Sequence, residues 1–147
     1  MAVQSVEYFL EEIKSAAKRG LLCSQMIIDI GLRELGLSSP DLVKGAGALV
    51  GAIGFQGVTC GALTGAGCLI VYAGVDKLER SVYLLIEELE SRFKDLASDY
   101  PGLHCSDILD YDPAKIPTEV CFPLIAGSIH IALDLLDKAG IRKDVTV

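Results

Sequence analysis

The chain has 147 residues and a net charge of −7, with 51% hydrophobic and 6% aromatic residues. This length predicts a single domain, residues 1–147, with an aliphatic core that buries about two thirds of the unfolded surface. The acidic balance argues against nonspecific binding to nucleic acid or anionic lipid, since no basic stripe is present to displace counterions. The N-terminus lacks a positive region leading into an apolar one, so we expect no secretory signal and a cytoplasmic location. Five cysteines in such a chain indicate metal binding or redox chemistry before structural disulfides.

Apolar residues recur at helical spacing along nearly the whole chain, and no alternating strand pattern of useful length occurs. The first helix is expected from about Val6 to Ala17, with Ser5 as its N-cap and Gly20 as its stop. A second is expected over residues 22–35. The predicted fold class is therefore all-α: a compact single-domain bundle of five to seven helices around a glycine-rich central helix pair.

The stretch Gly45–Gly74 is rich in glycine and holds no charged residue. Its length suits a membrane span, and Gly57, Gly61 and Gly65 repeat at the small-xxx-small spacing of membrane helices. Polar and glycine residues at positions 54–59 interrupt the run, however, and leave two halves of roughly a dozen residues each. We therefore predict two buried helices joined by a glycine turn, with no membrane span.

The first of these two helices is expected from Pro40 toward Ile53, and the second is expected to start near Cys60 with Thr59 as its cap. Glycine within a helix costs roughly 0.5 to 1 kcal/mol relative to alanine. Close approach of another backbone or of a prosthetic group would offset that cost. We accordingly predict that the glycines at positions 57, 61 and 65 contact a cofactor.

Two further helices and one helical turn are expected in the second half of the chain. The longest helix is predicted over Lys77–Leu96, and Cys105–Leu109 is predicted to form a short turn of helix. His104, which precedes that turn, is expected to be solvated rather than a ligand. The last helix is predicted to begin around Phe122-Pro123 and to end at Gly140.

Four of the five cysteines fall at or just before predicted helix starts: Cys23, Cys60, Cys105 and Cys121, whereas Cys68 lies within a helix. A helix start offers unpaired N–H groups and the positive end of the helix dipole, which are expected to lower a thiol pKa. Four thiolates so placed would suit one iron or zinc ion or an iron–sulfur cluster. The alternative is that these cysteines are small hydrophobic core residues. No compact CxxC pair decides between the two.

The order and surroundings of these cysteines resemble a known family. The matching segments are Cys23-Ser24-Gln25, Gly51–Gly57 leading into Thr59-Cys60-Gly61-Ala62-Leu63-Thr64-Gly65, and then Cys105 and Cys121. Between Leu22 and Ala132 the chain resembles the redox-active C_GCAxxG_C_C family, and Cys60-Gly61-Ala62-x-x-Gly65 is the most specific part of the match. The resemblance implies that Cys23, Cys60, Cys105 and Cys121 are the family's four cysteines and act in redox chemistry. A related domain in split-Soret-type cytochromes is associated with an iron–sulfur centre, which implies a [2Fe–2S] cluster on these four.

Three functions follow as hypotheses, and the sequence leaves open whether the protein is an enzyme. The first is electron transfer or redox sensing, with an unidentified redox partner, through an iron–sulfur cluster or a single iron or zinc ion on the four cysteines. The second is metal-free thiol–disulfide chemistry by the same residues. The third is a non-redox helical interaction module in which the cysteines pack the core and the glycine helix forms a homodimer face.

Overall fold

The computed structural model describes residues 3–109 and 117–143, and every regular element in them is helical. The α-helices are α1 (Val6–Lys18), α2 (Cys23–Glu34), α3 (Pro40–Gly45), α4 (Gly61–Leu78), α5 (Val82–Leu96), α6 (Cys105–Leu109) and α7 (Pro117–Lys138). Two short 3₁₀ helices, η1 (Ala46–Leu49) and η2 (Glu79–Ser81), join them. Within these ranges the extended structure is limited to one isolated antiparallel bridge, between Thr59 and His104. The predicted all-α class is confirmed.

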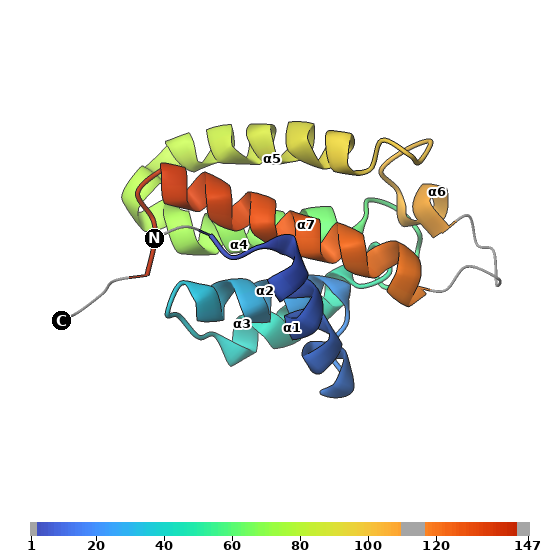
Figure 1. Cartoon of the computed structure of the whole chain (residues 1–147). Coiled ribbons are helices and arrows are strands. Elements are labelled where there is room, and N and C mark those ends of the chain that lie inside the picture. Colours follow the sequence, from blue (N-terminus) through green and yellow to red (C-terminus); the bar gives the residue numbers. More distant parts are fainter. Residues whose placement is uncertain (1–2, 110–116, 144–147) are drawn as a thin grey trace.

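Helix α4 is the centre of the bundle, since it packs against α2, α5 and α7 (Figure 1). Helix α1 lies against α7 and α2. Figure 1 shows that α2, α4 and α7 all begin on the same side of the molecule, at the right of this view, where α6 also lies. The N-terminal ends of three long helices therefore meet the short helix α6 at one end of the bundle.

The core between these helices is aliphatic, as the composition predicts. Its largest fully buried side chains are Phe9, Ile13, Ile27, Ile28, Ile30, Leu32, Leu69, Ile70, Leu89, Phe93, Ile108 and Ile129. Burial of each such side chain contributes about 1.5 to 3 kcal/mol relative to exposure. The core therefore draws on α1, α2, α4, α5, α6 and α7 and ties the two halves of the chain together.

The starts and ends of α1 and α2 are where the sequence predicts them. Ser5 caps α1, with its Oγ accepting a hydrogen bond of 3.2 Å from the backbone N–H of Tyr8. Gly20 follows α1 in the left-handed region at φ +85°. At the start of α2, the side chain of Gln25 accepts a 3.2 Å hydrogen bond from the backbone N–H of Leu22. Each cap pairs an N–H group that a helix start otherwise leaves unpaired.

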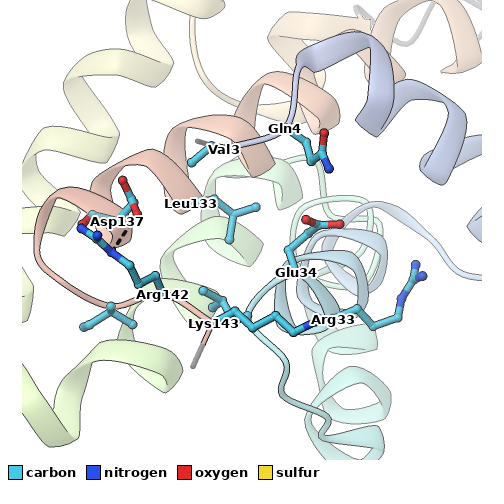
Figure 2. Close-up of a pocket in the computed structure, with 10 residues that line it drawn as sticks. Val3, Gln4, Arg33, Glu34, Leu133, Asp137, Arg142 and Lys143 are labelled. Carbon is cyan, nitrogen blue, oxygen red and sulfur yellow. Dashed lines mark hydrogen bonds and ion pairs between the residues drawn. The ribbon is translucent and has the colours of Figure 1, made fainter. Parts of the chain in front are cut away.

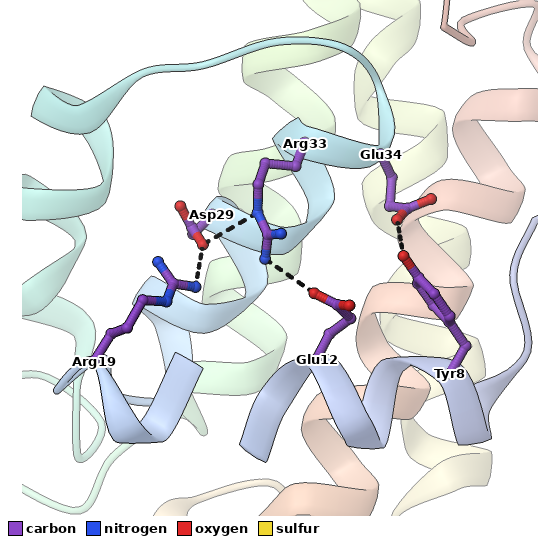
Figure 3. A network of polar contacts seen from close by, with 6 residues as sticks. All are labelled: Tyr8, Glu12, Arg19, Asp29, Arg33 and Glu34. Carbon is purple, nitrogen blue, oxygen red and sulfur yellow. Dashed lines mark hydrogen bonds and ion pairs between the residues drawn. The ribbon is translucent and has the colours of Figure 1, made fainter. Parts of the chain in front are cut away.

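Polar contacts join the outer surfaces of α1 and α2 (Figure 3). They are Arg19–Asp29 at 3.0 Å, Arg33–Glu12 at 3.3 Å, and the Tyr8 hydroxyl donating to Glu34 at 3.1 Å. Within α2, Arg33 also pairs with Asp29 at 3.5 Å. These groups are partly exposed, so each ion pair contributes at most about 1 kcal/mol. The network orients α1 on α2 rather than supplying much of the stability.

The helix predicted from Pro40 toward Ile53 is shorter than expected. Helix α3 ends at Gly45, η1 continues to Leu49, and residues 51–55 then form a left-handed turn. Three non-glycine residues take part in it: Ala52, Ile53 and Phe55 have φ values of +59°, +64° and +68°. Left-handed helical backbone costs roughly 1 to 2 kcal/mol for each residue that carries a Cβ. Hydrogen bonds back to the 3₁₀ helix and the residue after it hold the turn, from Gly54 N to Ala48 O at 3.0 Å and from Phe55 N to Val50 O at 3.1 Å.

Replacing Ile53 by glycine should raise the free energy of unfolding by about 0.5 to 1 kcal/mol, because glycine adopts this backbone conformation without steric cost. The side chain of Ile53 is 48% exposed, so little buried surface is lost. Urea unfolding followed by circular dichroism measures the change. Ile53→Ala is the matched control, because it removes the same side chain and keeps the Cβ; equal stability of the two variants would contradict the strain argument.

The helix predicted over Lys77–Leu96 begins later than expected, at Val82, and is not the longest, whereas its end at Leu96 matches the prediction. Glu79 follows α4 with φ +51° and ψ −132°, a backbone conformation that residues with a Cβ rarely adopt, and α5 begins at Val82 after a 3₁₀ turn. The side chain of Glu79 is exposed to solvent. Residues 77 and 78 therefore belong to the end of α4, and α4 and α5 pack against each other (Figure 1).

Helix α7 is the longest and starts earlier than predicted, at Pro117 instead of around Phe122-Pro123. Proline is favoured in the first turn of a helix, and here Pro117 takes that place. Pro123 lies within the helix and has no N–H to donate to the carbonyl oxygen of Glu119, four residues earlier. Both residues are exposed, so this oxygen lies near water. The end matches the prediction: Gly140 has φ +83°, and Ile141 N donates to Leu136 O at 2.8 Å.

Among the described residues, one segment is long and apolar enough to cross a membrane by length and composition: Glu119–Lys138 of α7, with 61% of the segment buried inside the bundle. A mostly buried core helix passes the same test, so this is weak evidence for a span. The glycine-rich stretch 45–74 is not such a segment, because the left-handed turn divides it.

Candidate functional site

Four of the five cysteines lie at the end of the bundle where α2, α4, α6 and α7 begin (Figure 1). Cys23 is the first residue of α2, Cys60 is the N-cap of α4, and Cys105 is the first residue of α6. The prediction that cysteines mark helix starts is confirmed for these three. It is wrong for Cys121, which lies in the second turn of α7 because that helix begins at Pro117.

A short antiparallel pairing joins the segments that carry Cys60 and Cys105. The backbone N–H of Cys60 donates to Leu103 O at 2.9 Å, and the N–H of Cys105 donates to Val58 O at 2.7 Å, around the bridge between residues 59 and 104. Side chains alternate between the two faces of paired strands. Cys60 and Cys105 therefore share one face, and the exposed His104 lies on the other, as expected of a solvated histidine.

Gly57 anchors α6 to this pairing. Its carbonyl oxygen accepts hydrogen bonds from the backbone N–H of Ser106 at 3.3 Å and from the Ser106 hydroxyl at 3.0 Å. Gly57 is buried and has φ +75°, a conformation in which a Cβ would be strained. In this structure Gly57 therefore positions the segment that carries Cys105.

The start of α6 has its own cap, which sequence reasoning missed. The Asp107 side chain accepts a 3.1 Å hydrogen bond from the backbone N–H of His104, and the N–H of Asp107 donates to His104 O at 2.9 Å. The spacing of three residues between 104 and 107 is the signal for a capping box, of which only the half from Asp107 forms here, since the second hydrogen bond is to the backbone oxygen of His104. The signal is weak here because histidine replaces the usual serine or threonine.

Gly61 and Gly65 let the start of α2 approach α4. A Cβ on Gly61 would lie 2.7 Å from Cys23 Sγ and 2.9 Å from Leu49 O, and a Cβ on Gly65 would lie 2.9 Å from Ser24 Cα. Neither position has room for a side chain. The two glycines thus place Cys23 against the first turn of α4; their predicted contact with a cofactor stays a prediction.

Burial raises the pKa of Cys60, Cys105 and Cys121, contrary to the expected lowering at helix starts. The pKa of Cys60 is raised to about 11, mainly by loss of hydration, although N–H groups of Ala62 and Leu63 oppose the shift. The pKa of Cys121 is raised to about 12, and that of Cys105 is also raised, again mainly by burial. The helix-start N–H groups are present at Cys60, but desolvation outweighs them.

The same four thiols act on one another electrostatically. Negative charge on Cys23 and Cys105 raises the pKa of Cys60, charge on Cys23 raises that of Cys105, and charge on all three raises that of Cys121. The pKa of Cys68, in contrast, is raised by burial alone. The structure therefore groups Cys23, Cys60, Cys105 and Cys121, which we call the cysteine centre, and leaves Cys68 outside.

All five cysteines are free thiols. Within residues 3–109 and 117–143, no three His, Cys, Asp or Glu side chains already stand as a metal-binding group. The donor set nevertheless fits soft metals and iron–sulfur clusters by its chemistry, since these are held by four cysteine thiolates. Rearrangement of the side chains would be needed for the sulfur atoms to meet.

A surface pocket lies between the C-terminal ends of α2 and α7, far from the helix starts that carry the cysteines (Figure 2). Its volume is about 330 Å³. Its charged side chains are largely paired: Arg142 with Asp137 at 3.0 Å, and Glu34 with the Tyr8 hydroxyl at 3.1 Å. Nothing about the pocket connects it with the cysteine centre.

Comparisons with curated proteins and with solved structures found no match. The family model described as "Putative redox-active protein (C_GCAxxG_C_C)" matches residues 21–135, which include the whole cysteine centre. This match covers most of the chain and confirms the resemblance seen in the motif around Cys60. The protein is therefore a member of the C_GCAxxG_C_C family of redox-active proteins.

Proposed function

We propose that the protein transfers electrons or senses redox state through the cysteine centre, with the four thiolates holding an iron–sulfur cluster, [2Fe–2S], or a single iron or zinc ion. The observation that carries this proposal is the position of four cysteines from four separate elements at one end of the bundle, whereas Cys68 lies within α4. Core packing alone gives no reason for four thiols to gather at one end.

Cys23, Cys60, Cys105 and Cys121 are the residues that would hold the group. An iron–sulfur cluster, when bound, supplies one-electron redox chemistry with a potential set by burial and by hydrogen bonds to sulfur. The thiols are partly buried, and the backbone N–H groups of Ala62 and Leu63 oppose the rise in the pKa of Cys60, so they favour negative charge on its sulfur.

The surrounding helices support negative charge at this end. Helices α2 and α4 start at the cysteine centre, and α7 starts close by, so the positive ends of three helix dipoles face it. Four thiolates in a partly buried site repel one another and lose hydration, as the raised pKa values of Cys60 and Cys121 indicate. A cation offsets both costs. The arrangement thus favours metal binding over four bare thiolates.

The test is analysis of iron, zinc and acid-labile sulfide in protein purified without oxygen, comparing wild type with Cys60→Ser and Cys68→Ser. We expect near-stoichiometric iron with sulfide in wild type and in Cys68→Ser. Cys60→Ser should lose most of it, because serine is a poor ligand for soft metals. Cys68→Ser is the matched control, since it removes a thiol outside the centre. Equal metal content in all three proteins would contradict the proposal, and iron or zinc without sulfide would indicate a single-metal site.

The second candidate is metal-free thiol–disulfide chemistry by the same four cysteines. Two observations favour it: the thiols are near one another, and no ready metal-binding group stands among the described residues. A loss of two mass units per bond on oxidation, with no metal after reconstitution, would establish it. If alanine at all four positions changed stability alone, both redox candidates would be excluded in favour of an interaction module.

The proposed setting is the cytoplasm, where glutathione and thioredoxin keep thiols reduced. An electron-transfer role also requires a redox partner, which we propose to be a protein that docks at the end of the bundle carrying the cysteine centre.

A further inference from the structure

The pairing between residues 57–60 and 103–106 fixes how Cys60 and Cys105 face each other. Because the hydrogen bonds flank the pair Thr59 and His104, Cys60 lies directly opposite Leu103, and Cys105 lies diagonally from Cys60 on the same face. Diagonal neighbours in antiparallel strands have Cα atoms about 7 to 8 Å apart. Disulfides join residues whose Cα atoms are usually about 4.4 to 6.8 Å apart. On this spacing, the register of the pairing keeps the Cα atoms of Cys60 and Cys105 farther apart than those of most disulfides.

One side chain reinforces that register. The hydroxyl of Ser106 donates to Gly57 O at 3.0 Å, in addition to the 3.3 Å hydrogen bond from the Ser106 backbone N–H. The next residue toward the N-terminus is Cys105, so any movement of Cys105 along the pairing must break the contact of Ser106 with Gly57. Ser106 is partly buried, which limits competition from water. Helix α6 has only five residues, and apart from the Asp107 cap and the hydrogen bond from Cys105 N to Val58 O, its start is held by these contacts of Ser106.

We propose that Ser106 is a positioning residue that holds Cys105 in diagonal register with Cys60 and so prevents these two thiols from forming a disulfide. Both thiols then stay available to the cysteine centre under oxidising conditions. A role for Ser106 in keeping these thiols reduced rests on the proposed function. The hydrogen bonds on which it depends, however, are present in the chain without metal.

The test uses diamide, a diazene oxidant, on the reduced and metal-free protein. In forming one disulfide, two thiols lose two electrons and two protons. The diazene takes up the two electrons and the two protons and becomes a hydrazine. After partial oxidation, free thiols are blocked with N-ethylmaleimide, and disulfide-linked peptides are identified and quantified by mass spectrometry.

We expect the Cys60–Cys105 disulfide to be a minor product in wild type and to increase about fivefold in Ser106→Ala, since loss of one hydrogen bond changes a local equilibrium by about that factor. Ser106→Thr keeps the hydroxyl and should restore the wild-type pattern. Ser81→Ala is the matched control: its hydroxyl donates to a backbone carbonyl, that of Leu78, at the far end of α4. It should leave the pattern unchanged.

Amide hydrogen exchange gives a second measurement on the same variants. The N–H of Cys105 donates to Val58 O, so its exchange should be faster in Ser106→Ala than in wild type by a similar factor. A predominant Cys60–Cys105 disulfide in wild type, or unchanged products and exchange in folded Ser106→Ala, would overturn the proposal. Iron and sulfide content of wild type decides the proposed function separately, so the failure of one is distinguishable from the failure of the other.

Discussion

Gly65→Ala is expected to lower the free energy of unfolding by about 2 kcal/mol or more. The added Cβ would lie 2.9 Å from Ser24 Cα and 3.2 Å from Ser24 O, so it would collide with the backbone of α2. Backbone cannot rotate away as a long side chain can, and α2 must therefore move off α4. Because Cys23 precedes Ser24, this movement would also pull one thiol away from the cysteine centre.

Gly67→Ala, two residues along the same helix, is the matched control. Its Cβ would lie 3.8 Å from the nearest atom, Ile86 Cδ1, which is ordinary contact. Alanine is a better helix former, so this variant should gain about 0.5 to 1 kcal/mol. Urea unfolding of both variants measures the difference. Equal effects of the two substitutions would show that helix propensity, rather than close approach of α2, decides the outcome.

The metal-free, reduced protein should lose stability as pH rises from 7 to 10. The pKa is raised in the folded state to about 11 for Cys60 and about 12 for Cys121, whereas an unfolded cysteine has a pKa near 8.5. Above pH 8.5 the unfolded chain therefore releases protons that the folded chain retains, which favours unfolding. Allowing for partial exposure of both thiols, we expect a total loss of about 2 kcal/mol at pH 10.

Urea unfolding under anaerobic conditions at pH 7 and pH 10 measures this loss. Other groups titrate in the same range, so the comparison requires a variant with alanine at both Cys60 and Cys121. That variant should lose less stability between the two pH values than wild type. If both proteins lost the same amount, burial of the two thiols in the folded state would not be the cause.

The parts of the fold that local chemistry decides could be predicted from the sequence. Ser5 and Gly20 bound α1, and Gly140 ends α7, because caps and left-handed glycines act on neighbouring residues alone. The left-handed turn could not be predicted, since isoleucine and phenylalanine disfavour positive φ and are held there by contacts with residues 48–52. The positive φ at Glu79 had no glycine or proline to signal it.

The four cysteines of the centre could be found from their order and from the motif around Cys60, but their environment could not. A helix start predicts a lowered thiol pKa, whereas burial by distant elements raises it, and burial depends on tertiary packing. The pairing that joins the segments of Cys60 and Cys105 connects residues about 45 positions apart and involves too few residues to show a strand pattern. The role of Ser106 follows only from that pairing.

The positions of the four cysteines determine when the centre becomes complete during synthesis. Residues 57–60 meet residues 103–106 only after α4 and α5 have been made, and the fourth thiol arrives with Cys121 in α7. Because synthesis proceeds from the N-terminus, Cys23 and Cys60 emerge from the ribosome well before their partners. The centre is therefore assembled last, by a nearly finished chain, and the early cysteines must remain reduced until α7 has packed.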